Sequence, residues 1–417
     1  MSLLMNSIPL IVIIVLLYKR QHMLFAGLVG GVLAFIIGGL TVDQATSIFV
    51  GGISNMLGIT IPIIYAAAAM MVSKAGSIQA LVELASRGIK GKVSILAGVI
   101  VLIQAFATYM AGMGAGNTMV TAPLMAMAVG ANPFVIAAMS IATAVGFTTS
   151  PASTETILAA ESAGLDVITH ASAMLPYTML FYLLAAGLAI YGVHKNGALI
   201  NQDGKKEEQN EKTNNWTLLK QSIPAVALLV MVLAGNSINS MLEIKIFTPA
   251  SIVIITAVLT VLLTPLNINK TGEALVDGSK FILTTLFGVG IFLGFINMIG
   301  ELGTFAQIAA LANNVPNMIV LPVAMILAFL IAIPSGAMTA GVLTLILPTL
   351  AALGLPPLAM GFVAIATGLG TQISPVQINV AALADGFKLD IIDIIKGNMK
   401  FVLGALALLI VIAMIVV

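Results

Sequence analysis

Cysteine is absent from this chain of 417 residues, and charged residues make up only 8% of it. Without cysteine the protein has no disulfide, iron–sulfur or thiolate chemistry. Ordinary globular domains carry about 25% charged residues, so the scarcity of charge excludes a soluble protein. The histidines are scattered and lack closely spaced carboxylates, which argues against a metal site. They are His22, His170 and His194.

The residues that are present are mostly apolar. Hydrophobic residues make up 60% of the chain, and the mean hydropathy is +1.13. Apolar runs long enough to cross a bilayer recur along the sequence. This pattern predicts an all-α polytopic membrane protein in contact with the lipid bilayer. The net charge of +1 identifies no further partner, and we expect no nucleic acid.

One polar segment divides the chain nearly in half. Residues 194–216 contain eight charged side chains, as expected for a solvated linker. The sequence therefore predicts a first half over 1–193 and a second half over 217–417.

The two halves resemble each other. An offset of 224 residues aligns Ser150-Pro151 with Ser374-Pro375 and Gly146 with Gly370. Between residues 131 and 166, ten of the 36 aligned positions are identical. Internal repeats of this kind are typical of secondary transporters.

The positive charges predict an orientation. If Lys19 and Arg20 are cytoplasmic and each half has five spans and one re-entrant hairpin, every Lys and Arg except Lys245 lies on the cytoplasmic side. An odd number of spans inverts the second half. We expect an inner-membrane protein with a cytoplasmic linker and both termini extracytoplasmic. Amphipathic stretches at 76–90 and 301–314 are expected on the inner and outer surfaces.

Each half contains a predicted re-entrant hairpin. The hairpins span about 92–130 and about 316–353, and they turn at Gly112–Thr118 and Pro334–Gly341. Irregular backbone at membrane depth persists only where it is buried in protein or lines a wet cavity. Glycine-mediated helix contacts are the simpler explanation, but the repeat favours hairpins.

A predicted broken helix follows each hairpin, at about 132–165 and about 355–388. Residues 133–164 are too many for one span of about 20 residues. Ser150 suits an N-cap, and Pro151 suits the first position of a new half-helix. A proline kink would explain one such pair, but the duplication favours two broken helices.

Two half-helices that start near the membrane midplane offer free N–H groups and partial positive charge. This arrangement is suited to an anion, above all a carboxylate, and the exposed carbonyls are suited to a small cation. The residues expected to bind substrate are Gly116, Asn117, Thr118, Thr148, Thr149, Ser150, Pro151, Ser153, Ser335, Gly336, Thr339, Gln372, Ser374, Pro375, Gln377 and Asn379.

Glu155 is the acidic residue that the repeat does not explain, because it aligns with Asn379. An intramembrane acid predicts a proton carrier, a Na⁺ ligand or a partner for a cationic group. The alternative is a side chain that faces water or caps a neighbouring helix. Glu155, Asn117 and Ser150 are the residues expected to take part in ion or proton coupling. Solvated helix-end charges are expected at Glu161, Asp166, Asp385 and Asp390.

Paired halves, a hairpin with Gly116-Asn117-Thr118 at its tip and a broken helix after it resemble the ion transporter superfamily. That group includes the divalent anion/sodium symporters, the citrate symporters and the C4-dicarboxylate carriers. The second tip, Pro334-Ser335-Gly336, lacks the Asn-Thr of the symporter motif, which argues against a symmetric pair of sodium sites. The resemblance implies a homodimer whose transport domain moves as an elevator.

These observations predict a secondary active transporter of small organic anions, di- or tricarboxylates, coupled to H⁺ or Na⁺. One alternative is a Na⁺/H⁺ antiporter, and another is the large membrane subunit of a binding-protein-dependent carboxylate transporter. An intramembrane enzyme would need a catalytic set of side chains, and the sequence offers none. No cofactor is expected beyond the coupling ion.

Overall fold

The structure is a computed structural model of the chain. It describes residues 3–19, 21–57, 60–88, 92–112, 114–151, 153–197, 214–311, 315–336, 339–352 and 354–417. Within these ranges the regular secondary structure is helical and contains no β-strand.

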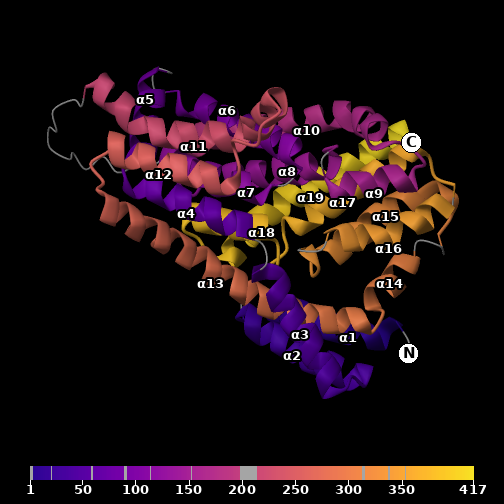
Figure 1. The fold of residues 1–417 in the computed structure, drawn as a ribbon. Helices are drawn as coiled ribbons and strands as arrows, with labels where there is room; N and C mark the ends of the chain where they lie inside the picture. Colours follow the sequence, from indigo (N-terminus) through magenta and orange to yellow (C-terminus); the bar gives the residue numbers. More distant parts are fainter. Residues whose placement is uncertain are drawn as a thin grey trace.

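The helices of the first half are mostly apolar and are separated by short turns (Figure 1). They are α1 (Leu3–Tyr18), α2 (Met23–Gly38), α3 (Val42–Leu57), α4 (Thr60–Lys74), α5 (Ser77–Gly88), α6 (Val93–Ala111), α7 (Ala115–Val129), α8 (Pro133–Thr149), α9 (Thr154–Ser162) and α10 (Val167–Asn196).

The second half is also helical, and its early helices α11 and α13 are long, with 28 and 34 residues. Its helices are α11 (Asn215–Leu242), α12 (Pro249–Leu263), α13 (Ile268–Glu301), α14 (Thr304–Ala309), α15 (Asn317–Ala332), α16 (Thr339–Ala352), α17 (Pro357–Thr371), α18 (Ile378–Phe387) and α19 (Ile391–Val416).

The described helices confirm an all-α polytopic membrane protein. Two of them, α10 and α19, are individually long and apolar enough to cross a bilayer. Helices α8 and α9 pass the same test together and are bent by 52° at the break between them. Most other apolar helices in the described ranges are shorter, at 10–17 residues.

Two helices differ from what hydropathy predicts. The sequence pattern gives no span over Val42–Leu57, because Asp43, Gln44 and Asn55 dilute its apolar character. It also predicts a span that starts near Thr284, whereas α13 starts at Ile268, where the Asn267 side chain accepts a hydrogen bond from Lys270 N at 2.9 Å. A polar first turn is invisible to a hydropathy window but is stabilised by its cap.

The described residues form two hydrophobic cores. The larger one surrounds α8 and α17, in which residues 135–149 and 359–371 are all buried. The smaller one joins α1, α2 and α3 to the C-terminal part of α13, below the main body in Figure 1. The broken helices are therefore among the most deeply buried elements.

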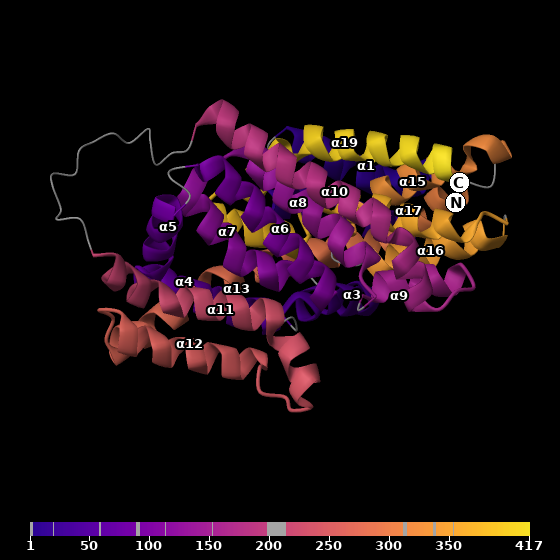
Figure 2. The ribbon, with the colours of Figure 1, turned by 90° about the horizontal axis from the view of Figure 1, so that it is seen from above.

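Both termini lie at one end of the molecule, and α5 lies at the other (Figures 1 and 2). The predicted linker, 194–216, begins within the last turn of α10 and ends at the first turn of α11. Its residues 198–213 lie outside the described residues, so its solvation stays a prediction.

The halves exchange partners at their second half-helices. Helix α18 of the second half packs against α7 of the first, and α9 of the first half packs against α16 of the second. Helices α8 and α17 contact each other directly. The predicted repeat and its inversion across the membrane stay predictions.

Candidate functional site

The first break lies between α8 and α9. Helix α8 ends at Thr149, and the main-chain N–H of Ser153 donates to Ser150 O at 3.1 Å. The Ser153 hydroxyl then caps α9 by accepting from Thr156 N at 3.1 Å. The predicted start, with Ser150 as N-cap and Pro151 in the first turn, is therefore wrong. Pro151 instead follows the residue that opens a turn, a position that its fixed φ favours.

The second break repeats this geometry. Helix α17 ends at Thr371, and Gln377 N donates to Ser374 O at 3.4 Å. The Ser374 hydroxyl accepts from Val376 N at 3.2 Å, and α18 starts only at Ile378. The duplicated Ser-Pro pair thus marks two turns rather than two helix starts.

Helices α8 and α17 cross at Ala144 and Gly368, which are equivalent positions in the two halves. A Cβ atom placed on Gly368 would lie 2.9 Å from Ala144 O and 2.6 Å from Thr148 Cγ2. Ala144 and Gly368 are separated by the repeat offset of 224 residues. Glycine at the crossing lets the two backbones approach closely, and this approach brings the two breaks into one region.

Gly146 and Gly370, which are equivalent in the two halves, allow each broken helix to pack closely on a hairpin helix. A Cβ on Gly146 would lie 2.7 Å from the Tyr182 hydroxyl and 3.0 Å from Thr108 Cγ2 of α6. A Cβ on Gly370 would lie 2.3 Å from Phe329 O of α15. Each broken helix therefore packs tightly on the first helix of its own hairpin.

The first predicted hairpin tip is narrower than expected. Helix α6 ends at Ala111 and is capped by Gly112, whose φ of +67° favours glycine, and α7 starts at Ala115. Gly116, Asn117 and Thr118 consequently lie in the first turn of α7 instead of in an unwound tip. Met113 lies outside the described residues.

The second hairpin breaks between α15 and α16, where the turn was predicted. The Ser335 hydroxyl donates to Ile331 O at 2.5 Å, and Thr339 is buried in the first turn of α16. A Cβ on Gly336 would lie 2.4 Å from Ser374 Oγ. This hairpin therefore ends directly against the second break.

Gln104 of α6, which the sequence analysis did not single out, organises a buried polar network. Its amide nitrogen donates to Thr118 Oγ1 at 2.9 Å and to Thr143 Oγ1 at 2.7 Å. Its amide oxygen accepts from Thr121 Oγ1 at 3.2 Å. A glutamine in an otherwise apolar helix was the available signal, because such a side chain needs partners when it is buried.

The network continues into the second half. The Thr118 hydroxyl donates to Asn379 Oδ1 at 2.5 Å, and Asn379 Nδ2 donates to Gln372 Oε1 at 2.7 Å. Asn398 of α19 donates to Gln372 O at 3.2 Å and to Ser140 Oγ at 2.7 Å. The structure therefore joins Thr118, Gln372 and Asn379 of the predicted site.

Other predicted residues are used locally. The Thr148 hydroxyl donates to Ala144 O and the Thr149 hydroxyl to Val145 O, both at 2.8 Å. Ser150, Pro375 and Gln377 are buried, whereas Pro151 is exposed. Pro151 is thus the predicted residue that faces away from the protein interior.

Glu155 is partly buried in the first turn of α9. Helix α9 packs against α8, α10, α16 and α17. Helices α8, α16 and α17 contain no Lys, Arg, His, Asp or Glu. No ion pair to Glu155 occurs among the described side chains.

Of the four acids expected to be solvated at helix ends, Asp166 and Asp390 are N-caps and Glu161 is exposed near the end of α9. Asp385 is buried, so the expectation that it is solvated is wrong. Asp166 caps α10 by accepting from Ile168 N at 3.1 Å and Thr169 N at 3.0 Å. Hydrogen bonds from the Thr169 side chain and main chain hold the pKa of Asp166 below its ordinary value of 3.8. Asp385 accepts from Lys388 Nζ at 2.8 Å.

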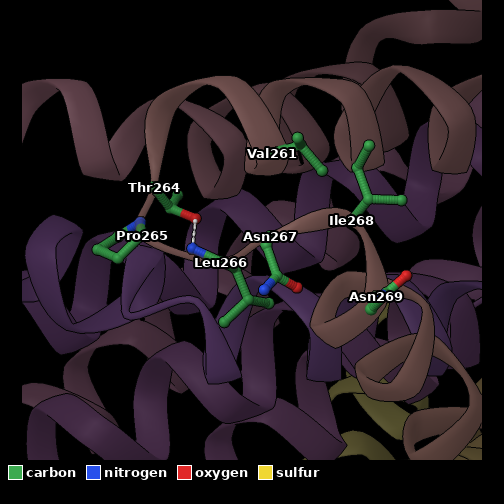
Figure 3. Close-up of a pocket in the computed structure, with 7 residues that line it drawn as sticks. All are labelled: Val261, Thr264, Pro265, Leu266, Asn267, Ile268 and Asn269. Carbon is green, nitrogen blue, oxygen red and sulfur yellow. Dashed lines mark hydrogen bonds between the residues drawn. The ribbon is translucent and has the colours of Figure 1, made fainter.

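An open hollow at the α12–α13 turn is separate from these residues (Figure 3). The Thr264 hydroxyl there accepts from Leu266 N at 3.2 Å, and Asn267 caps α13. Its polar atoms serve the turn, and none of its lining residues belongs to the predicted site. The lining residues are Val261, Thr264, Pro265, Leu266, Asn267, Ile268 and Asn269.

Comparison with known proteins gives one family match. The model of the Na⁺/H⁺ antiporter family matches residues 2–195, the span from α1 to α10. No curated protein matches the chain. Among solved structures, a YdaH transporter from Alcanivorax borkumensis is similar, with 14% identity and a TM-score of 0.39. The match covers 90% of this chain and 89% of that one.

The family match corrects the predicted resemblance. The superfamily of divalent anion/sodium symporters, citrate symporters and C4-dicarboxylate carriers is not the one that matches. The homodimer and the elevator movement that it implied lose that support. The matched family consists of transporters, so the chain is a membrane transport protein and not an enzyme.

Proposed function

We propose that this protein is a Na⁺/H⁺ antiporter in which Glu155 carries the proton and the cation in turn. The observation that carries the proposal is the position of Glu155, a partly buried acid in the first turn of α9, beside a helix break and within the residues that the family model matches. An acid inside the membrane is a functional group by default, because a charge in the membrane interior is costly.

The physical basis is competition for one carboxylate. A carboxylate in a medium of low dielectric constant is stabilised either by a bound proton or by a bound cation. When Na⁺ binds, the proton leaves, and when the proton returns, Na⁺ leaves. A protein that crosses the membrane only in these two states exchanges one ion for the other.

The groups around Glu155 favour a cation over an anion. Helices α8, α16 and α17 provide no basic side chain to hold a carboxylate substrate. The Ser153 hydroxyl and Ser150 O lie next to the break and hydrogen-bond to each other, and oxygen atoms of this kind are the ligands of hard cations. The organic-anion function is therefore the less supported of the two predictions.

The test is proton movement in proteoliposomes with a pH-sensitive dye inside. An inward Na⁺ gradient should alkalinise the lumen with the native chain, and Glu155→Gln should reduce the rate to that of empty liposomes. Glu161→Gln is the matched control, because Glu161 is an exposed acid on the same helix. Its activity should equal that of the native chain.

Two results would contradict the proposal. One is full Na⁺-driven proton movement by Glu155→Gln. The other is uptake of a radiolabelled di- or tricarboxylate by the native chain in the absence of any Na⁺-driven proton movement.

A further inference from the structure

Glu155 and Asn379 occupy equivalent positions in the two halves. They are separated by 224 residues, and each is the second residue of its half-helix, α9 or α18. Each half-helix packs against the hairpin of the other half, α9 on α16 and α18 on α7. The molecule therefore has two related positions for an ion-binding side chain, and they carry different chemistry.

Both polar atoms of the Asn379 side chain are hydrogen-bonded to protein groups. Its amide oxygen accepts from Thr118, and its amide nitrogen donates to Gln372, whose own nitrogen donates to Thr371 Oγ1 at 3.0 Å. Asn379 is buried and carries no ionisable proton. The bond between Thr118 and Asn379 links α7 to α18. Because Asn379 does not ionise, it adds no charge at this position.

The Glu155 position has few titratable neighbours. Of the elements packed on α9, only α10 carries titratable side chains within the described ranges. The buried one nearest the start of α10 is His170, whose ring nitrogens lack hydrogen-bond partners among the described residues. On α9 itself the other acid is Glu161, which is exposed. The remaining titratable residues of α10 are Tyr177, Tyr182, Tyr191, His194 and Lys195.

Building on the exchange proposed above, we propose that one monovalent cation is exchanged for one proton, so that the cycle moves no net charge. The carboxyl O–H bond breaks as the cation binds, and the proton passes to water. The loaded site is neutral with either ion, whereas the empty site carries one negative charge that the membrane interior disfavours. A divalent cation would leave a net positive charge, so Na⁺ and Li⁺ are expected substrates, and Ca²⁺ and Mg²⁺ are not.

The experiment measures the null point of exchange in proteoliposomes of the full chain. The Na⁺ and H⁺ gradients are varied, and the membrane potential is set with a gradient of the permeant anion thiocyanate, because K⁺ is itself a monovalent cation. Net proton movement should stop where the two gradients are equal, and the potential should not shift that point. His170→Gln, which removes a buried titratable side chain of α10, the helix that packs on α9, should leave the null point unchanged.

The outcomes separate the two proposals. Suppose that Glu155→Gln abolishes exchange, but that the null point of the native chain moves with the potential or differs in His170→Gln. That result overturns the one-for-one stoichiometry and leaves the antiport function standing. Proton movement driven by Ca²⁺ overturns the restriction to monovalent cations. Failure of Na⁺ to move protons in the native chain overturns the antiport function itself.

Discussion

At the scale of single residues, the same backbone position serves different purposes in the two halves. Ser150 and Ser374 each accept the hydrogen bond of a turn, so this role is shared. Glu155 and Asn379 occupy equivalent positions in the two halves, but only Glu155 has a side chain that ionises. Gln104 shows how much a single polar side chain contributes, since it links α6, α7 and α8 from inside the core.

Replacing Gln104 with methionine keeps the side-chain volume but removes its amide. Hydroxyl groups of Thr118, Thr121 and Thr143 lose a buried partner, which costs about 1–3 kcal/mol of stability. We expect a lower melting temperature for the purified protein in detergent. Gln21→Met is the control, because Gln21 is exposed, and it should melt with the native chain. Equal melting of the two variants would mean that the network is not formed.

At the scale of elements, the crossing of α8 and α17 fixes where the two breaks meet. Both helices are buried along almost their whole length, so neither has room to shift. Close-packed interiors respond to one added methyl group, because neighbouring atoms are already in contact. Gly368 at the crossing is therefore as important to the site as any polar residue.

Gly368→Ala tests this crossing. The new Cβ would overlap Ala144 O and Thr148 Cγ2, and overpacking of this kind costs about 1–3 kcal/mol. Gly187→Ala on α10 is the matched control, because nothing lies within 4 Å of its added Cβ. In a helix that change alone should stabilise by about 0.5–1 kcal/mol. Thermal melts should therefore shift in opposite directions, and a shift of Gly368→Ala to higher temperature would contradict the crossing.

At the scale of the whole molecule, the halves are tied together by exchanged contacts instead of being two separate domains. Helix α13 of the second half packs on α2, α3 and α4 of the first. An ion pair between Lys74 and Asp277 adds a polar link between α4 and α13. Both termini lie at one end of the molecule (Figures 1 and 2).

Cysteine labelling tests the orientation, and the chain has no native cysteine to interfere. Leu4→Cys and Val417→Cys should react with an impermeable maleimide in intact cells from which any outer membrane has been removed. Lys195→Cys, at the end of α10, should react only after the membrane is opened. These expectations follow from the positive-inside rule, which places the linker charges in the cytoplasm. Labelling of Lys195→Cys and Leu4→Cys from the same side would contradict the predicted topology.

The sequence alone determined the class of the protein and the places where its helices break. Low charge and long apolar runs leave no alternative to a helical membrane protein, because lipid satisfies no backbone hydrogen bonds. The duplicated Ser-Pro pairs located both breaks, since proline and glycine act through the local backbone. The family resemblance drawn from the motif letters was wrong, because two matching residues at a hairpin tip are a weak signal.

Only the tertiary structure decided which residues meet. The role of Gln104 and the bond between Thr118 and Asn379 depend on contacts between residues 14 to 261 positions apart. Local patterns do not encode such distances, because side-chain partners are set by helix crossings. In the folded chain both polar atoms of the Asn379 side chain are hydrogen-bonded, whereas Glu155 has no ion-pair partner among the described side chains. Of these two equivalent positions, Asn379 is therefore a structural contact between helices, and Glu155 is the candidate ion site.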